Sequence, residues 1–432
     1  MEKIYITGHK NPDLDTICSA MAYAGLKNIV DPANEYIAVR CGHLSQSCEN
    51  ILSALKITPP PYMPDVYPKV KDVMLSPTLK VEKSARLSEI AKHYKDTYPS
   101  VTPIFDAGEF VGLLSIDDIT AWYMSGISSG ADMGRVPKVS EVMRDQAEPL
   151  MAGDLFEDAK KALSASPKRG LAVYDGGDFV GYVTRRCFLK APKYNVILMD
   201  HNEPRQSIKG IETANIMEII DHHRLDTFKT NLPIFIDAEP LGSTCTIVYL
   251  LYLRNNLVPD KETARILLTG MMSDTLILKS PTTTPVDVEA AHALAEIVGE
   301  SVQNFGIKIF SHVESLSAVK PEKAILTDFK RYTEKGVSIG IGQCEATTLN
   351  DLDEYKEKFL RALEDVRLKN GLDWAVVMIT DVMKENSVLL STDFKSAKNL
   401  PYAQMEEGIY DMPGVMSRKK QLLPEMLFAL GM

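Results

Sequence analysis

Four short groups of histidine and aspartate residues are the part of this sequence best suited to chemistry. They are His9 with Asp13 and Asp15, then Asp200-His201, then Asp221-His222-His223, and finally Ser273-Asp274-Thr275. Carboxylates gathered this densely would repel one another unless cations neutralised them. A mixture of imidazole and carboxylate ligands suits Mn²⁺, Co²⁺ or Fe²⁺ better than Mg²⁺, which prefers oxygen ligands alone. The groups together hold enough ligands for two ions.

Each group also has an ordinary structural explanation when it is taken alone. Asp15 could cap the helix that follows it, Asp274 could end a helix, and a pair of adjacent histidines is often a surface feature. The joint occurrence of all four groups at one edge of a predicted sheet favours a metal site. Two ions ~3.5–4 Å apart can share a water that loses its proton near neutral pH, which is typical of phosphohydrolases.

The elements that must position these groups alternate between strand and helix. Open α/β folds bind ligands at the carboxyl ends of their strands, where the polar groups stand in this sequence. We expect strands at Ile4–Thr7, Tyr36–Arg40, Asn195–Met199, Ile216–Ile220 and Leu232–Ile236, and helices at Thr16–Val30, Ser45–Leu55, Thr244–Asn255, Lys261–Met272 and Val286–Val298.

An internal repeat interrupts this pattern. A break with five prolines between residues 59 and 68 precedes it. Val73-Met74 recurs as Val142-Met143, and Phe110-Val111-Gly112 recurs as Phe179-Val180-Gly181, so both motifs repeat after 69 residues (142 − 73 and 179 − 110). Two matched offsets indicate two copies of one unit, inserted into an α/β domain.

A smaller α+β region forms the end of the chain. We expect a hairpin of Ala324–Tyr332 with Val337–Gln343, a charged helix at Leu352–Lys369, and strands at Trp374–Ile379 and Val388–Ser391. This region also holds Lys330 and the cluster Ser417-Arg418-Lys419-Lys420-Gln421. A solvated face is the usual explanation of such a cluster. Beside a metal site, however, Arg offers bidentate contact to phosphate and Lys offers a point charge.

The composition sets limits on the function. The chain has 432 residues, of which 45% are apolar and 25% charged, and its six cysteines are too sparse for a disulfide scaffold. No apolar run approaches the ~18 residues that span a bilayer. A net charge of −10 argues against nucleic acid or anionic membrane as a partner. The N-terminus enters a strand without a signal-like segment, so we expect a cytoplasmic protein.

The motifs resemble those of family II inorganic pyrophosphatases, in the DHH phosphoesterase superfamily. The resemblance is carried by Gly-His-Lys-Asn-Pro-Asp-Leu-Asp-Thr at 8–16, Asp-His-Asn-Glu at 200–203, Asp-His-His at 221–223, Ser-Asp-Thr at 273–275 and Ser-Arg-Lys-Lys-Gln at 417–421. The last motif separates pyrophosphatases from the phosphodiesterase branches. The resemblance implies hydrolysis of pyrophosphate to two phosphates, with two Mn²⁺ or Co²⁺ ions per active site and Mg²⁺ accompanying the substrate.

The same resemblance implies a role for individual residues. One metal would be held by His9 and Asp13, the other by Asp15, His222 and Asp274, and Asp200 would bridge the two. His201 would orient the loop around Asp200. The residues that would bind the substrate phosphates are His223, Lys330, Arg418 and Lys419.

The repeat resembles a tandem pair of CBS domains, which implies binding of AMP, ADP, ATP or diadenosine polyphosphates. The CBS pattern ends its second strand with Ser or Thr, two residues, and an Asp that takes the ribose hydroxyls. Ser115 and Asp118 provide it in the first copy, whereas the second copy pairs Thr184 with Cys187. The cations that could meet the phosphates are Lys168, Arg169, Arg185 and Arg186, although a solvated surface explains them about as well. CBS pairs usually associate face to face, so a homodimer is expected.

The sequence therefore predicts an α/β fold. A DHH-type parallel-sheet catalytic domain, formed by residues 1–65 and 191–305, would hold the CBS pair as an insert at 66–190, and a smaller α+β substrate-binding domain would follow at 316–432. Two alternatives remain: a DHH-type phosphodiesterase acting on short oligonucleotides or cyclic dinucleotides, and a non-catalytic nucleotide sensor. The first would need a nucleoside-binding surface where Ser-Arg-Lys-Lys-Gln stands, and the second would be expected to lose metal ligands.

Overall fold

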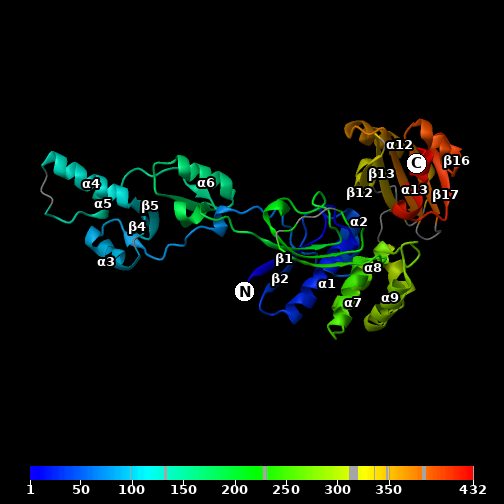
Figure 1. Ribbon diagram of the computed structural model, residues 1–432, viewed down its shortest axis with the longest axis horizontal. Helices are drawn as coiled ribbons and strands as arrows, with labels where there is room; N and C mark the ends of the chain where they lie inside the picture. Colours follow the sequence, from blue (N-terminus) through cyan, green and yellow to red (C-terminus); the bar gives the residue numbers. More distant parts are fainter. Residues whose placement is uncertain are drawn as a thin grey trace. The chain divides into compact units, whose positions relative to one another are not determined.

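The protein is described by a computed structural model that covers residues 1–432 apart from short gaps (Figure 1). The gaps are residues 98, 131–133, 227–229, 231, 311–319, 335, 347–348, 350, 382–385 and 432, together with the side chains of 93–97. The chain forms two compact units. Val66–Tyr194 is the second unit, and it interrupts the first, which consists of Met1–Asp65 and Asn195–Met432.

A five-stranded parallel sheet forms the centre of the first unit's α/β part. Its order is β11-β10-β9-β1-β2, so strands from before and after the interruption lie side by side. The strands are β1 (Lys3–Thr7), β2 (Glu35–Val39), β9 (Asn195–Met199), β10 (Asn215–Asp221) and β11 (Phe235–Ala238). The last begins three residues later than predicted, because Pro233 has no N–H to donate to a sheet.

Helices pack around this sheet and share one apolar core with it. They are α1 (Leu14–Val30), α2 (Gln46–Ala54), α7 (Thr244–Arg254), α8 (Lys261–Asp274), α9 (Pro285–Val298) and α10 (Val302–Phe310). Helix α1 packs against α7 and α8, and the core includes Ile6, Ile17, Ile197 and Leu267. Burial of each such side chain contributes about 1.5–3 kcal/mol to folding. The boundaries of the five predicted helices agree with prediction to within two residues, whereas α10 was not predicted.

The C-terminal part of the first unit is a six-stranded sheet of order β12-β13-β14-β15-β17-β16. Its strands are β12 (Asp328–Glu334), β13 (Val337–Ala346), β14 (Trp374–Asp381), β15 (Asn386–Ser391), β16 (Ala403–Glu406) and β17 (Ile409–Pro413). Helices α11 (Pro321–Thr327) and α12 (Leu352–Lys369) cover one face, and α13 (Leu423–Ala429) covers the other. The predicted fold class, a parallel-sheet α/β domain followed by a C-terminal domain, is confirmed.

One predicted element of this part is wrong in its first half. The expected strand Ala324–Tyr332 begins in the structure as helix α11 and turns into β12 only at Asp328. Pro321 stands in the first turn of α11, where its fixed backbone angle and missing N–H favour a helix. Ala324 and Ile325 are buried in the core formed with α12, so tertiary packing stabilises the helix.

The second unit consists of two copies of one small sheet. The first copy holds β3 (Val81–Glu82), β4 (Val101–Asp106) and β5 (Glu109–Ser115), with helices α3 (Leu87–Thr97) and α4 (Ile116–Ser129). The second copy holds β6 (Leu150–Met151), β7 (Gly170–Asp175) and β8 (Asp178–Thr184), with α6 (Phe156–Ala165). A short helix α5 (Val139–Val142) lies between them in the chain.

The strands of the two copies are in register, and the copies pack against each other. Each strand of the second copy begins 69 residues after its counterpart (150 − 81, 170 − 101 and 178 − 109). Phe110 and Phe179 are equivalent positions, and their rings stack with centroids 3.6 Å apart and planes 3° from parallel. Among the residues that the structure describes, no helix is long and apolar enough to cross a membrane.

Candidate functional site

The start of helix α1 carries the first group of polar residues. Asp13 is the N-cap of this helix, and its side chain accepts a hydrogen bond of 2.8 Å from the Thr16 backbone N–H. Asp15 follows in the first turn and is buried. The turn between β1 and α1 is tight, because a Cβ added at Gly8 would lie 1.9 Å from Cγ2 of Thr16. Gly8 thus allows the helix N-terminus to approach the end of the strand.

Two neighbouring strands deliver further groups to the same edge of the sheet. Asp200 directly follows β9, with a left-handed backbone at φ 59° that non-glycine residues adopt rarely. Asp221 is the last residue of β10, and His222 and His223 come after it. Because β1, β9 and β10 are adjacent and parallel, their carboxyl ends bring these residues together.

Asp200 is the centre of the resulting cluster. Its Oδ2 lies 3.5 Å from Nε2 of His9, and its Oδ1 lies 3.5 Å from Nε2 of His222. His222 also approaches Oδ2 of Asp274 at the end of α8, at 3.4 Å, and His9 lies 3.4 Å from Oδ2 of Asp13. The structure thus brings all six predicted metal-ligand residues into one site.

The donor atoms of this cluster form three overlapping groups. Within each group the atoms lie within 4.8 Å of one another, which is close enough to coordinate one ion. The groups are His9 with Asp13 and Asp200, Asp15 with His222 and Asp274, and Asp200 with His222 and His223. Asp200 and His222 each belong to two of the groups, so neighbouring ions would share ligands.

The charges of the cluster show that it fits cations. Burial and the nearby Asp200 carboxylate raise the pKa of Asp15 to about 6. Burial also raises the pKa of Asp274 well above its usual range, although His222 opposes this. For His9, burial alone would lower the pKa, but Asp13 and Asp200 outweigh it and raise the pKa to about 10. A bound cation would relieve this repulsion among the carboxylates, and the mixed oxygen and nitrogen donors suit transition metals.

Asp221 holds His223 rather than joining the three groups. It is fully buried, and its Oδ1 accepts hydrogen bonds from the His223 backbone N–H, at 3.0 Å, and pairs with Nδ1 of the same ring at 2.9 Å. Asn202 donates to the other carboxylate oxygen at 2.5 Å. Sequence reasoning gave Asp221 no role of its own. Its position as the residue before the His-His pair was the available signal.

His201 is buried beside the cluster, with its ring centroid 6.4 Å from that of His9. Its Nδ1 lies 2.8 Å from the carbonyl oxygen of Met199, and its Nε2 lies 2.5 Å from Oγ of Ser207. Burial lowers the pKa of His201 to about 4, so the ring is neutral. Both nitrogens are engaged, and His201 therefore orders the loop after Asp200.

The predicted phosphate-binding cations lie in the C-terminal domain. Lys330 is on β12, and Arg418 and Lys419 begin the turn at Arg418–Leu422, after β17. Arg418 is only 4% exposed, and it donates to Oδ1 of Asp328 at 2.9 Å and to the Asp328 carbonyl at 2.7 Å. Its Nε has no hydrogen-bond partner among the residues that the structure describes. Burial and the nearby Lys330 lower the pKa of Lys419. The three cations therefore form one positive group.

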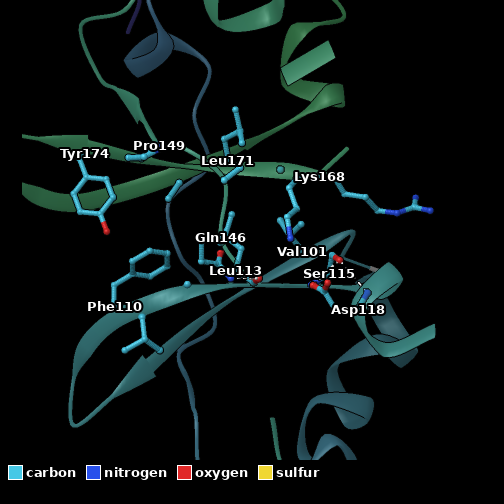
Figure 2. Close-up of a pocket in the computed structure, with 16 residues that line it drawn as sticks. Val101, Phe110, Leu113, Ser115, Asp118, Gln146, Pro149, Lys168, Leu171 and Tyr174 are labelled. Carbon is cyan, nitrogen blue, oxygen red and sulfur yellow. Dashed lines mark hydrogen bonds between the residues drawn. The ribbon is translucent and has the colours of Figure 1, made fainter. Parts of the chain in front are cut away.

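A separate cavity of about 260 Å³ lies between the two copies in the second unit (Figure 2). Ser115 and Asp118 line it from the first copy, and Lys168 and Arg169 line it from the second. Asp118 accepts from the Ser115 backbone N–H at 2.9 Å and from its hydroxyl at 2.7 Å. In Figure 2, Lys168 extends toward the side of the cavity where Ser115 and Asp118 lie. These polar groups face the apolar and amide side chains of Val101, Leu113, Gln146, Leu171 and Tyr174.

Three residues named as nucleotide contacts do not line this cavity: Thr184, Arg185 and Arg186. Thr184, at the end of β8, contacts Cys187, and Arg185 donates to the carbonyls of Leu163 and Ser166. Arg169 is also not free, because it forms two hydrogen bonds, of 2.6 and 2.8 Å, with the Asp117 carboxylate. The sequence offered no signal for this pair, since its members are 52 residues apart.

Comparisons with known proteins cover both ends of the chain. The profile of the DHH family, N-terminal domain, matches residues 3–271, and that of the DHHA2 domain matches residues 307–428. A cobalt-dependent inorganic pyrophosphatase of Clostridium perfringens is 28% identical, over 98% of this chain and 97% of the relative. A manganese-dependent inorganic pyrophosphatase of Bacillus subtilis is 35% identical, over 55% of this chain and 77% of the relative.

A solved structure shares the fold. It is that of a Methanococcus jannaschii protein provisionally assigned as a family II inorganic pyrophosphatase. The TM-score is 0.60 with 24% identity, and the match covers 99% of this chain and 100% of the other. At this level of identity the similarity shows the fold alone.

Proposed function

This chain belongs to the DHH family, and from that premise we propose that it is a manganese- or cobalt-dependent inorganic pyrophosphatase that hydrolyses pyrophosphate to two phosphates. The observation that carries the proposal is the cluster around Asp200, in which three donor groups overlap. The two relatives named above support the choice of substrate, since both are inorganic pyrophosphatases and one matches nearly the whole chain.

The donor groups suggest how two Mn²⁺ or Co²⁺ ions would be held. His9 and Asp13 would bind one ion, Asp15, His222 and Asp274 would bind the other, and Asp200 would contact both. When bound, such ions activate a water and polarise a phosphoryl group, and Mg²⁺ would accompany the pyrophosphate.

The protein side chains would bind and orient the substrate. Nδ1 of His223 pairs with the Asp221 carboxylate, which leaves Nε2 as the ring atom available to a phosphate oxygen. Lys330, Arg418 and Lys419 would neutralise the charge of the phosphates. Arg418 is already fixed by Asp328, so little side-chain entropy would be lost when it binds substrate.

Phosphate release tests the proposed reaction. The protein is loaded with Mn²⁺ or Co²⁺ and given pyrophosphate with Mg²⁺, and bis-p-nitrophenyl phosphate is run alongside. We expect pyrophosphate to be hydrolysed and the diester to be left intact. Activity on the diester alone would indicate the phosphodiesterase alternative. Activity on neither compound, with AMP still bound, would indicate a nucleotide sensor.

We also propose that the second unit is a tandem CBS pair that binds an adenine nucleotide and regulates the enzyme. The supporting observation is the cavity between the copies, where the Asp118 carboxylate and the cation Lys168 both line one space. A carboxylate suits ribose hydroxyls and a cation suits phosphate. AMP, ADP, ATP and a diadenosine polyphosphate, each titrated into the metal-loaded enzyme, test the proposal; no change in activity with any of them would contradict regulation.

The proposed domains follow from these assignments. The catalytic domain would be 1–65 with 191–305, the regulatory insert 66–190, and the substrate-binding domain 316–432.

We propose a cytoplasmic homodimer. Strand β11 pairs only with β10 in the part of the chain that the structure describes, and it exposes Phe235 and Ile236, each at 49%. Light scattering on the purified protein would reveal a monomer if the dimer proposal is wrong.

A further inference from the structure

The first residues of helix α7 belong to none of the donor groups, but they contact two of the clustered carboxylates. Ser243 is the N-cap of this helix, and its hydroxyl donates to Oδ1 of Asp15 at 2.5 Å. The backbone N–H groups of Thr244 and Cys245 donate to the same carboxylate at 2.7 and 3.0 Å. Asp15 therefore occupies the position that an anion takes at a helix N-terminus.

The Thr244 side chain contacts a second carboxylate. Its hydroxyl donates to Oδ1 of Asp200 at 3.0 Å, and the hydroxyl of Thr16, in the first turn of α1, donates to Oδ2 at 2.7 Å. Thr16, Thr244 and Asp200 are all buried. Each oxygen of Asp200 thus receives one neutral donor, which leaves further lone pairs for a cation.

We propose that Thr244 is a positioning residue of the metal centre. Its hydroxyl holds the Asp200 carboxylate in the orientation in which the two oxygens face different donor groups. This inference rests on the proposed metal-dependent function. Partners that orient metal ligands typically change metal affinity about 10- to 100-fold when they are removed. Thr16 would act in the same way, but it also contacts His9 at 2.8 Å, so Thr244 gives the cleaner test.

The same helix supplies a matched control. Thr246 lies two residues further on, is equally buried, and donates through its hydroxyl to Oδ1 of Asp287 at 2.6 Å. Asp287 is a fully buried carboxylate that also accepts from Gly242 N–H, and it belongs to none of the donor groups. Thr244 and Thr246 therefore differ in whether the carboxylate that they hold belongs to the metal cluster.

The experiment measures Mn²⁺ affinity by competition with a fluorescent chelator. The wild type is compared with Thr244→Val, Thr244→Ser and Thr246→Val, and the thermal unfolding of each metal-free protein is recorded. We expect Thr244→Val to weaken Mn²⁺ binding about 10- to 100-fold. Thr244→Ser should bind as the wild type does, because it keeps the hydroxyl. Thr246→Val should lower the unfolding temperature and leave Mn²⁺ affinity unchanged.

Two results would overturn the positioning role. One is Thr244→Val binding Mn²⁺ as tightly as the wild type, and the other is Thr246→Val losing as much affinity as Thr244→Val. If Thr244→Val does not fold, Thr244→Ala replaces it, since it also removes the hydroxyl. A wild-type protein that binds neither Mn²⁺ nor Co²⁺ would refute the proposed metal dependence itself. Failure of the inference alone leaves wild-type binding and hydrolysis intact.

Discussion

The carboxylate cluster of the first unit and the Arg169–Asp117 pair of the second unit hold their charges in opposite ways. In the cluster, Asp200 is 2% exposed and contacts Thr16, Thr244 and several histidines. Beside the cavity, the Arg169–Asp117 pair is about half exposed, at 46% and 53% of the two side chains, whereas Asp118, which lines the cavity, is buried. Buried charges are costly to leave unpaired, whereas exposed pairs contribute about 0–1 kcal/mol. Substitutions should therefore act strongly in the cluster and weakly at the Arg169–Asp117 pair.

The two copies of the repeat differ in the side chain that accepts a hydrogen bond at one equivalent turn. Ser115 and Asp118 in the first copy correspond to Thr184 and Cys187 in the second. In both copies a backbone N–H donates to the side chain three residues later, at 2.9 Å to the carboxylate and at 3.3 Å to the thiol. The turn is thus preserved without the carboxylate. Folding needs only a capping atom at this position, whereas a carboxylate is a far stronger acceptor than a thiol for a ribose hydroxyl.

Replacing Asp200 should have the largest effect. Asp200→Asn removes the negative charge that two donor groups share, so both metals should be held loosely. We expect pyrophosphate hydrolysis to fall by at least about 10³-fold, which corresponds to about 4 kcal/mol in the barrier. Phosphate release at a Mn²⁺ concentration that just saturates the wild type measures this loss. Asp237→Asn is the control, since Asp237 is also a buried aspartate but lies on β11 and pairs with Arg254 at 2.7 Å. Near-normal turnover in Asp200→Asn would contradict the assignment of Asp200 as the ligand shared by both metals.

Replacing Asp118 should have the next largest effect. Asp118→Ala removes the carboxylate that lines the cavity, and we expect AMP to bind about 10-fold more weakly or worse, as for the loss of a hydrogen bond to a charged group. Calorimetric titration with AMP measures this. Asp154→Ala is the control, because Asp154 caps the Met151 N–H at 2.8 Å in the same unit but does not line the cavity. Unchanged AMP binding in Asp118→Ala would mean that the nucleotide binds elsewhere.

Restoring a carboxylate in the second copy should sharpen the comparison between the repeats. Cys187→Asp gives the second copy the arrangement that Ser115 and Asp118 form in the first. The new carboxylate can accept a hydrogen bond from the Thr184 backbone N–H, as the thiol does. We expect the number of AMP molecules bound per chain to rise by up to one, as measured by equilibrium dialysis. Cys187→Ser provides a capping atom without charge and should leave that number unchanged. An unaltered number in Cys187→Asp would show that more than the carboxylate is missing.

The Asp117–Arg169 pair should give the smallest effect. Asp117→Asn releases Arg169 from a competing carboxylate, so the guanidinium can meet a phosphate at lower cost. Because exposed pairs contribute about 0.2–1 kcal/mol, AMP affinity should increase only about 1.5- to 5-fold. The increase should shrink in high salt, which screens the pair in the wild type. Weaker AMP binding in Asp117→Asn, at any salt concentration, would contradict the idea that Asp117 competes with the ligand.

Local patterns in the sequence determined much of the fold and the membership of the proposed metal site. Short continuous apolar runs, which are typical of parallel strands buried on both faces, predicted the strands of the sheet, and apolar residues recurring every 3.6 positions predicted the helices around them. The ends of those strands then indicated which histidines and aspartates would meet. The 69-residue offset predicted the repeat, since equivalent strands need equivalent spacing.

Tertiary structure alone decided how those residues are held and which of them act together. Thr16 meets Asp200 across 184 positions of the chain, and Thr244 meets it across 44, so neither pairing leaves a local signal. The helix at Pro321–Thr327 forms where a strand was predicted, because burial against α12 outweighs the local pattern. Likewise, only the packing of the two copies separates Lys168, which lines the cavity, from Arg185, which does not. Side-chain hydrogen bonds depend on distances in space, and the order of residues along the chain does not specify those distances.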